Sequence, residues 1–263
     1  MPRQPGRAEA YERHTGRYAA ALASEFVPFA GVEPGMRVLD VGCGTGKLTE
    51  VVASMTGSDR VVGVDPSEEY LEACRTRLPG TELHTATGEE LPFEDGAFDC
   101  VLSQMVVQAL DEPPRAAREM VRVCAPGGTV ATCAWDFRDG MPLLDAYWGA
   151  ALAVDPEGAG EAGGDEHNPW CTFEGLQRFW REAGAGEVEG AEVSVSADYD
   201  GIEDAWWPFA AGAGLSGSYC RSLNDATRTA LHGEFQRRLG SPPGRFSLTA
   251  RAWMSRGRAP LNG

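Results

Sequence analysis

The sequence predicts an α/β protein whose mostly parallel sheet is covered by helices on both faces. Segments typical of strands and of helices alternate from residue 36 to residue 135, which is the order that builds a parallel sheet with helical crossovers. The apolar run 38–41 stops at a glycine-rich turn, and the next apolar run ends on the acid Asp65. Ligands of such sheets bind at the carboxyl ends of the strands. The sequence therefore predicts a ligand site at the turn after the first strand.

Local signals justify each element of the first half. Apolar residues of 8–30 recur every three or four positions, which predicts an amphipathic helix ahead of the sheet. Ser67 is a natural N-cap, and Glu68 and Glu69 place negative charge in the first turn of the helix that follows. The expected strands are 36–41, 60–65, 81–86, 98–105 and 128–135, and the expected helices between them are 47–55, 67–78 and 113–123.

Beyond Trp135 the periodic signals weaken. The expected helices are 142–154, 172–183, 202–211 and 223–239, the expected strands are one within 187–197 and one over 245–254, and the acidic stretch 155–168 is expected to be a mobile loop. We expect a single domain overall with three parts: an N-terminal helical lid at 1–35, a cofactor-binding core at 36–136, and an acceptor-binding cap at 137–263 that also completes the sheet.

Composition limits the partners. The formal net charge is −16 and the pI is about 4.7, so the surface repels nucleic acid and anionic membranes. The seven cysteines form no CxxC pair and no metal-ligand spacing, and no window resembles a signal peptide or a membrane span. We expect a cytoplasmic bacterial protein without a metal, acting on a small molecule. A homodimer is left open.

The glycine-rich turn carries the strongest functional signal. Asp40 ends the first strand, and Gly42, Gly44 and Gly46 follow with the spacing G-x-G-x-G. Glycine lets the backbone approach a ligand closely. The third glycine of a dinucleotide fingerprint would stand one position later, at Lys47, so a bound pyrophosphate is disfavoured. Asp65 lies about 20 residues beyond the loop, where an acid can bind ribose hydroxyls. These features predict a cationic nucleoside without phosphate.

Four stretches together resemble the class I S-adenosylmethionine-dependent methyltransferases, in particular the group similar to ubiquinone and menaquinone-biosynthesis methyltransferases. They follow the order and spacing of that family. The stretches are VLDVGCGTG at 38–46, VVGVDPS at 61–67, GEELPFEDGAFDCVLSQM at 88–105 and RVCAPGGTVATCAWD at 122–136.

The resemblance implies a Rossmann-like sheet of seven strands with an antiparallel last strand at 245–254, and an inserted helical cap. It implies S-adenosyl-L-methionine as cofactor, lying across the carboxyl edge of the sheet next to Asp40. By resemblance, Gly42, Cys43 and Gly44 face the methionine part, Asp65 holds the ribose, Pro66 and Ser67 lie against the adenine, Thr87, Gly88 and Glu89 border the adenine amine, and Ser103, Gln104 and Met105 lie beside the sulfonium. The family often has Asp where Thr87 stands, so the amine contact falls to Thr87, to backbone or to Glu89.

Methyl transfer from a sulfonium is an in-line displacement, for which positioning supplies up to ~7–11 kcal/mol. A hydroxyl acceptor is helped by a neutral histidine that takes its proton. His14 is the preferred candidate, because it shares a helix face with Tyr11 that, by resemblance, folds over the cofactor. A purely structural role for His14 stays open, and His167 and His232 are competitors.

Two further N-terminal residues are candidates for cofactor contacts. Tyr11 is placed to contact the methionine tail. Arg17 carries a fork of donors that suits the cofactor carboxylate, and the alternative is a surface ion pair with Glu12 or Glu25.

Aromatic residues are concentrated where the family builds its acceptor pocket. This favours an aromatic or hydrophobic acceptor in specialised metabolism, although rings that only fill a core are equally expected. The tryptophans in question are residues 135, 148, 170, 180, 206 and 207. Three alternatives remain: a cyclase or rearrangement enzyme on the same fold, a cofactor-binding module without catalysis, and, remotely, an NAD oxidoreductase.

Overall fold

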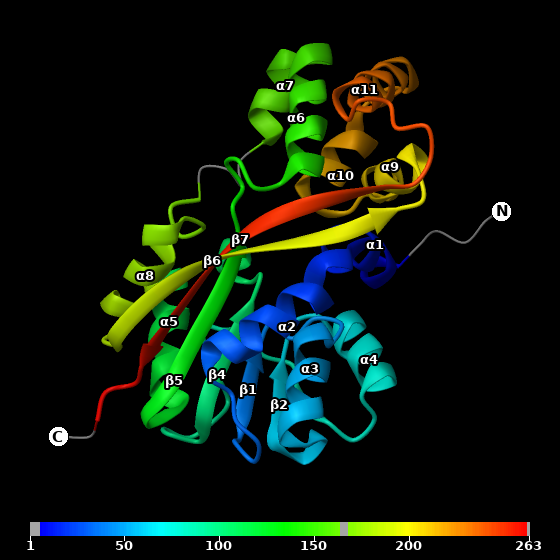
Figure 1. Cartoon of the computed structure of the whole chain (residues 1–263). Helices are drawn as coiled ribbons and strands as arrows, with labels where there is room; N and C mark the ends of the chain where they lie inside the picture. The colour runs from blue at the N-terminus through cyan, green and yellow to red at the C-terminus, as the bar shows by residue number, and fades with distance from the viewer. Residues whose placement is uncertain (1–5, 164–167, 262–263) are drawn as a thin grey trace. The chain divides into compact units, whose positions relative to one another are not determined.

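A computed structural model describes residues 6–163 and 168–261 (Figure 1). The described chain forms two compact units that interleave along the sequence. The sheet unit comprises residues 19–135, 168–193 and 252–261, and the helical unit comprises residues 6–18, 136–163 and 194–251. The sequence analysis expected three consecutive parts, 1–35, 36–136 and 137–263, whereas each unit here combines three separate segments.

The strands of the described residues form one seven-stranded sheet in the order β3-β2-β1-β4-β5-β7-β6 (Figure 1). β1 pairs in parallel with β2 and β4, β4 pairs in parallel with β5, and β7 runs antiparallel to β5. The predicted sheet and its reversed last strand are therefore confirmed. The strands are β1 Val38–Val41, β2 Val61–Val64, β3 Glu82–His84, β4 Phe98–Gln104, β5 Cys124–Trp135, β6 Gly186–Tyr199 and β7 Phe246–Arg258.

Helices of the sheet unit cover both faces of the sheet. The crossover from β1 to β2 moves along the sheet in the opposite direction from the crossover from β4 to β5. Because such crossovers are right-handed, their helices α3 and α5 lie on opposite faces, as Figure 1 shows. α2 packs beside α3, and α8 packs beside α5. The bounds are α2 Ala19–Ala30, α3 Lys47–Thr56, α4 Glu68–Arg77, α5 Pro113–Val123 and α8 Phe173–Glu182.

Aromatic stacking forms the core of the helical unit. Tyr147 stacks on Phe209 with ring centroids 4.1 Å apart, and Phe235 meets Phe209 edge to face at 5.6 Å. Trp206 borders the same cluster. The helices are α1 Arg7–Arg13, α6 Pro142–Val154, α7 Pro156–Ala162, α9 Ile202–Ala211, α10 Gly214–Ser222 and α11 Asp225–Arg238.

The continuous helix expected over 8–30 is wrong. α1 ends at Arg13, His14 leaves helical geometry with φ −93° and ψ −118°, and a 3₁₀ turn over Thr15–Tyr18 leads into α2. Glycine permits this tight turn, because a Cβ at Gly16 would stand 2.7 Å from the carbonyl oxygen of Tyr11. Hydrophobic periodicity continues across the break, so it does not reveal it.

The second half needs two more corrections. Part of the expected loop 155–168 is helix α7, whose first turn is stabilised because the Asp155 carboxylate accepts a hydrogen bond from the Gly158 amide at 3.2 Å. The rest of that expectation includes residues 164–167, which lie outside the described residues. The single helix expected over 223–239 begins at Asp225, and the separate α10 before it was missed. No helix of the described residues is long and apolar enough to cross a membrane.

Candidate cofactor site

The glycine loop leaves β1 in a conformation that requires glycine. Gly42, Gly44 and Gly46 have φ values of +72°, +53° and +86°. A Cβ at Gly42 would also stand 2.3 Å from Val106, whereas the nearest atom to a Cβ at Gly44 would be 4.0 Å away. Gly42 is therefore packed against protein, and Gly44 faces open space that a ligand can use.

Asp65 is held against this loop by backbone amides. Its side chain is 7% exposed, and it accepts hydrogen bonds from the Gly44 amide at 3.0 Å and the Ser67 amide at 2.8 Å. Burial raises the pKa of the Asp65 carboxyl, and these two amides oppose that rise. Pro66 follows directly, and the Ser67 hydroxyl caps α4 by accepting from the Tyr70 amide. Loop and acid thus form one hydrogen-bonded unit.

Asp40 lies in β1, just before the loop, and is almost fully buried, at 1% exposure. Its Oδ2 accepts a hydrogen bond from the Thr49 hydroxyl at 2.7 Å, and its Oδ1 has no hydrogen-bond partner among the described residues. Burial raises the pKa of Asp40 to about 7, and the nearby Asp65 adds to the rise while the Thr49 bond opposes it. Asp40 thus ties the end of β1 to α3 inside the protein.

The segment expected to border the adenine has one side chain already engaged. The Glu89 carboxylate accepts hydrogen bonds from the amides of Asp111 and Glu112 at 3.0 and 3.3 Å, just before α5. Glu89 therefore satisfies backbone donors at a helix start. Gly88 is buried and Thr87 is exposed, which leaves Thr87 the more accessible of the residues considered for the adenine amine.

β4 ends in a strained backbone. Met105 has a φ of +62°, which is uncommon for a residue other than glycine and is typical of sites that bind ligands. Gln104 donates from Nε2 to the carbonyl oxygen of Ala19 at 3.0 Å, which ties the start of α2 to this strand. Ser103 is buried, and its carbonyl accepts from the Thr132 hydroxyl. The strand end expected beside the sulfonium is thus held from both neighbouring elements.

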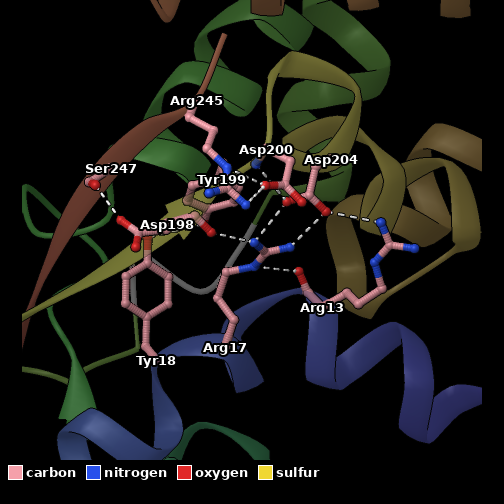
Figure 2. Close-up of polar contacts among 9 residues, drawn as sticks. All are labelled: Arg13, Arg17, Tyr18, Asp198, Tyr199, Asp200, Asp204, Arg245 and Ser247. Carbon is pink, nitrogen blue, oxygen red and sulfur yellow. Dashed lines mark hydrogen bonds and ion pairs between the residues drawn. The ribbon is translucent and has the colours of Figure 1, made fainter.

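Tyr11, His14 and Arg17 belong to the helical unit, whereas the glycine loop and Asp65 belong to the sheet unit. Figure 2 shows the surroundings of Arg17. Its guanidinium donates to both carboxylate oxygens of Asp204, at 2.9 and 3.0 Å, and to the carbonyl oxygen of Asp198 at 2.6 Å. Arg17 therefore forms an ion pair with Asp204.

His14 is buried in an apolar environment. It is 7% exposed and meets Phe209 edge to face, with ring centroids 5.2 Å apart. Burial, aided by the charge of Arg17, lowers the pKa of His14 to about 4, so the ring is neutral at physiological pH. Its Nε2 has no hydrogen-bond partner among the described residues. Of the competitors, His232 has Nε2 3.2 Å from Glu203, and His167 lies outside the described residues.

Several residues that shape these sites were not predicted from the sequence. Asp204 binds both Arg17 and Arg13, and Val106 packs against Gly42. Cys74 on α4 touches the loop at Gly46. None of them stands in a motif, because each acts through a contact between segments distant in the chain.

Half of the six tryptophans expected near the acceptor pocket are buried in the core. Trp135 and Trp180 are fully buried, and Trp206 packs among the rings of the helical unit. Trp207 lies beneath the Arg13 guanidinium, and Trp170 lies beneath that of Arg178. Most of these rings already have protein partners.

The sheet order, the glycine loop and the acid at the end of β2 are typical of α/β domains that bind nucleosides. Residues 39–132 match the family described as a methyltransferase domain, and this segment belongs to that family. S-adenosylmethionine is the cofactor of the class.

Curated relatives include methyltransferases. The chain is 40% identical over 130 residues to an uncharacterised methyltransferase of Mycobacterium tuberculosis, covering 49% of this chain and 50% of the relative. It is 38% identical over 111 residues to a demethylmenaquinone methyltransferase of Symbiobacterium thermophilum, covering 40% and 44%. The chain spans about half the length of the curated relatives it matches.

Solved structures share the fold. A protein of Anaeromyxobacter dehalogenans described as a type II methyltransferase superposes with a TM-score of 0.65 at 18% identity, covering 94% of this chain and 98% of the other. At this identity the likeness concerns the fold alone.

Proposed function

We propose that the chain is an S-adenosylmethionine-dependent methyltransferase that methylates O, N or C of a small aromatic or hydrophobic metabolite. The observation that carries the proposal is the bond between Gly44 and Asp65. This hydrogen bond occupies the Gly44 amide, which a bound pyrophosphate would need. It also places the Asp65 carboxylate at the same edge of the sheet. Negative charge there favours a cationic nucleoside over a dinucleotide.

The residues of the sheet unit fit such a ligand. Gly44 offers bare backbone on its open side, and Asp65 keeps further acceptor positions for ribose hydroxyls after bonding two amides. The strained end of β4 at Met105 lies at the carboxyl edge, where ligands of this fold bind. When bound, S-adenosylmethionine supplies an electrophilic methyl group on a positively charged sulfur.

Orientation is the main task left to the protein, since the leaving group is already activated. His14 is the candidate base, because its ring is neutral and its Nε2 is unpaired among the described residues. A pKa of about 4 makes it a weak base. It would therefore take the proton as methyl transfer makes the acceptor hydroxyl more acidic.

The acceptor class in this proposal rests on the aromatic content of the helical unit. Trp148 and Trp207 are half-buried rather than enclosed, so their rings keep surface for a flat or apolar partner. With net charge −16, we also propose that nucleic acid is not the substrate.

Two measurements test the proposal. Calorimetric titration with S-adenosylhomocysteine and with NAD should show binding of the first only, and Asp65→Ala should weaken that binding by about tenfold or more. Asp59→Ala, at an exposed acid of the same unit, is the matched control. Binding of NAD instead, or unchanged affinity in Asp65→Ala, would remove the proposal.

An acceptor screen with a labelled methyl donor then tests transfer itself. Formation of S-adenosylhomocysteine together with a methylated product supports the methyltransferase. Conversion of an acceptor without use of the methyl group would identify a cyclase or rearrangement enzyme. Tight binding with no turnover on any acceptor would identify a cofactor-binding module.

A further inference from the structure

A small polar cavity lies in the sheet unit, where the end of β7 and the start of β6 meet the first half of β5. Its volume is about 230 Å³, which is below the ~300–1,000 Å³ of sites for drug-sized ligands. The cavity therefore suits a very small ligand. Its lining residues, all of them in the sheet unit, are Thr129, Glu187, Glu189, Arg256, Gly257 and Arg258.

The cavity is separate from the candidate cofactor site. Thr129 of β5 pairs with Cys100 of β4, and Cys100 pairs with Val38, the first residue of β1. The glycine loop instead follows Val41, the last residue of β1. Because these three strands are parallel, the cavity lies toward their amino ends, whereas the cofactor site lies at their carboxyl ends. A ligand of the cavity is therefore distinct from the cofactor and from its methyl acceptor.

Arg256 and Glu189 form a wall whose charges already neutralise each other. Arg256 donates from Nε to the Glu189 carboxylate, and from Nη1 to the carbonyl oxygen of Phe29 at 2.6 Å. Its guanidinium also lies 5.2 Å from the centroid of the Phe29 ring. The hydroxyl of the buried Ser255 donates to the Glu189 carbonyl oxygen at 3.1 Å. This pair is thus held in place by protein and needs no ligand.

Arg258, in contrast, carries a charge that no acid balances. Its Nη1 donates to the Thr129 hydroxyl oxygen at 2.9 Å and to the Gly127 carbonyl oxygen at 3.4 Å, and both acceptors are neutral. Among the described residues, no carboxylate pairs with Arg258, and its Nε and Nη2 donors have no hydrogen-bond partner. These two nitrogens form a fork that can bind a carboxylate with two parallel hydrogen bonds.

Glu187 brings the opposite charge to the same cavity. Its carboxylate has no partner in the part of the chain that the structure describes. Its φ of +49° is uncommon for a residue other than glycine, and such conformations persist only where the surroundings impose them. A Cβ at Gly257 would stand 3.2 Å from Val188 and 3.3 Å from the Gly186 carbonyl oxygen. The start of β6 therefore packs closely on β7, which fixes the backbone that carries Glu187.

Arg258 and Glu187 thus line one cavity with opposite charges but form no ion pair with each other. A molecule that carries both a carboxylate and an ammonium group can bridge them. We propose that the cavity is a binding site for a small amino acid, whose carboxylate pairs with Arg258 and whose ammonium group pairs with Glu187. The proposal does not depend on the proposed function.

The charge of the lining favours this ligand over a simple ion. Two acids and two arginines line the cavity, so a neutral zwitterion satisfies both free groups without adding net charge. Inorganic phosphate would leave Glu187 unpaired and would be repelled by it, and an inorganic cation would have the same disadvantage beside Arg258. Because exposed ion pairs contribute little individually, we expect a dissociation constant in the millimolar range, about 10 mM or lower.

NMR titration of the whole chain, labelled with nitrogen-15, tests the proposal at constant ionic strength. The probes are glycine, β-alanine and 4-aminobutyrate, which separate their two charges by increasing distances. At least one probe should shift the amide signals of Gly257 and Arg258 and reach saturation. Acetate and methylamine carry only one of the two charges, so each should bind about tenfold more weakly or less.

Variants that remove one charge assign the two contacts. Arg258→Gln and Glu187→Gln should each lower the affinity for the tightest probe by about tenfold or more. Arg118→Gln and Glu192→Gln are the matched controls at exposed positions of the sheet unit outside the cavity, and they should keep the wild-type affinity. Glu187→Gly also removes the carboxylate, but glycine suits the positive φ, so this variant should fold and still not bind.

The proposal is overturned if no probe gives a saturable shift, or if acetate or methylamine binds as tightly as the best amino acid. Unchanged affinity in Arg258→Gln or Glu187→Gln would also overturn it. Shifts centred on Gly44 rather than on Gly257 would place the amino acid in the cofactor site, with the same consequence. Asp65→Ala should keep the wild-type affinity for the amino acid, whatever its effect on S-adenosylhomocysteine, because Asp65 belongs to the other site.

Discussion

Arg17 and Asp204 form a two-pronged ion pair although 187 positions separate them in the chain. Both are mostly shielded from solvent, with side-chain exposures of 16% and 18%. Arg13 donates to the same carboxylate at 2.9 Å. The pair fastens the N-terminal segment to the start of α9 within the helical unit (Figure 2). In this structure the Arg17 guanidinium, which the sequence analysis assigned to a cofactor carboxylate, donates to Asp204 and to the carbonyl oxygen of Asp198.

Replacing Asp204 should loosen this N-terminal segment. Asp204→Asn removes the charge that Arg17 and Arg13 share, and breaking such a shielded pair costs roughly 1–3 kcal/mol. Denaturant unfolding should report the loss, and α1 should become more sensitive to proteolysis. Asp200→Asn is the control, because Asp200 pairs with Arg245 at the surface, where ion pairs contribute little. Equal losses in the two variants would contradict the interpretation.

Low pH should also weaken the ion pairs of Asp204, because it protonates the carboxylate. Burial alone would raise the pKa of Asp204, but hydrogen bonds from Arg17 and Arg13 lower it to about 2, below its usual 3.8. The carboxylate therefore contributes stability above pH 3.8 that is lost as the pH falls through about 2. The difference in unfolding free energy between wild type and Asp204→Asn should shrink over this interval. A constant difference from pH 5 to pH 2 would contradict it.

The contrast between Gly44 and Arg17 shows what could be predicted from the sequence. Alternating strands and helices, the loop glycines and Asp65 are local signals, and together they predicted the sheet and the ligand edge. The partner of Arg17 is set by tertiary packing between α9 and the turn after α1, which no periodic pattern encodes. The break at His14 was missed for a similar reason, since the apolar stripe continues through a turn that depends on the single Gly16.

Gly42 and Gly44, two glycines of the same loop, should respond differently to replacement by alanine. Gly42→Ala adds a Cβ that would stand 2.3 Å from Val106 at a φ of +72°, so we expect destabilisation of about 3 kcal/mol or more. Gly44→Ala meets open space and should cost only about 1 kcal/mol for its positive φ. It should nevertheless weaken S-adenosylhomocysteine binding, because the Cβ enters the ligand side.

Thermal unfolding and calorimetric titration of both variants check this contrast. Gly35→Ala is the control, since it combines a φ of +85° with open space outside the cofactor loop. It should match Gly44→Ala in stability and the wild type in affinity. A stable Gly42→Ala, or a Gly44→Ala variant with unchanged affinity, would contradict the assignment of the two faces.

Asp40 should make the protein less stable as the pH rises. Its pKa is raised from 3.8 to about 7 by burial, so the folded state binds the proton more tightly than the unfolded state. The resulting stability is present below pH 3.8 and is lost as the pH rises through about 7. Asp40→Asn keeps an acceptor for Thr49 without the charge. At pH 8 it should be more stable than the wild type by roughly 1–4 kcal/mol.

Unfolding free energies at pH 5 and pH 8 measure this effect. The gain in Asp40→Asn should be smaller at pH 5, where Asp40 of the wild type is largely protonated. Asp59→Asn, at an exposed position, should show no such difference. A gain of equal size at both pH values would mean that the substitution acts through packing rather than through charge.

Replacement of His14 separates a catalytic role from a structural one. If His14 Nε2 takes the proton of the methyl acceptor, His14→Gln should slow turnover by about 10²-fold or more. The variant should keep its affinity for S-adenosylhomocysteine, because residues of the sheet unit supply that binding. Wild-type turnover should also stay level as the pH falls from 7 to 5, because the ring is protonated only near its pKa of about 4. Labelled methyl transfer to an identified acceptor gives both readouts.

Full turnover in His14→Gln, or a wild-type rate that already halves near pH 6.5, would assign the proton to another group. His14→Ala adds the structural measure: lost contact with Phe209 should lower the melting temperature whichever role His14 has.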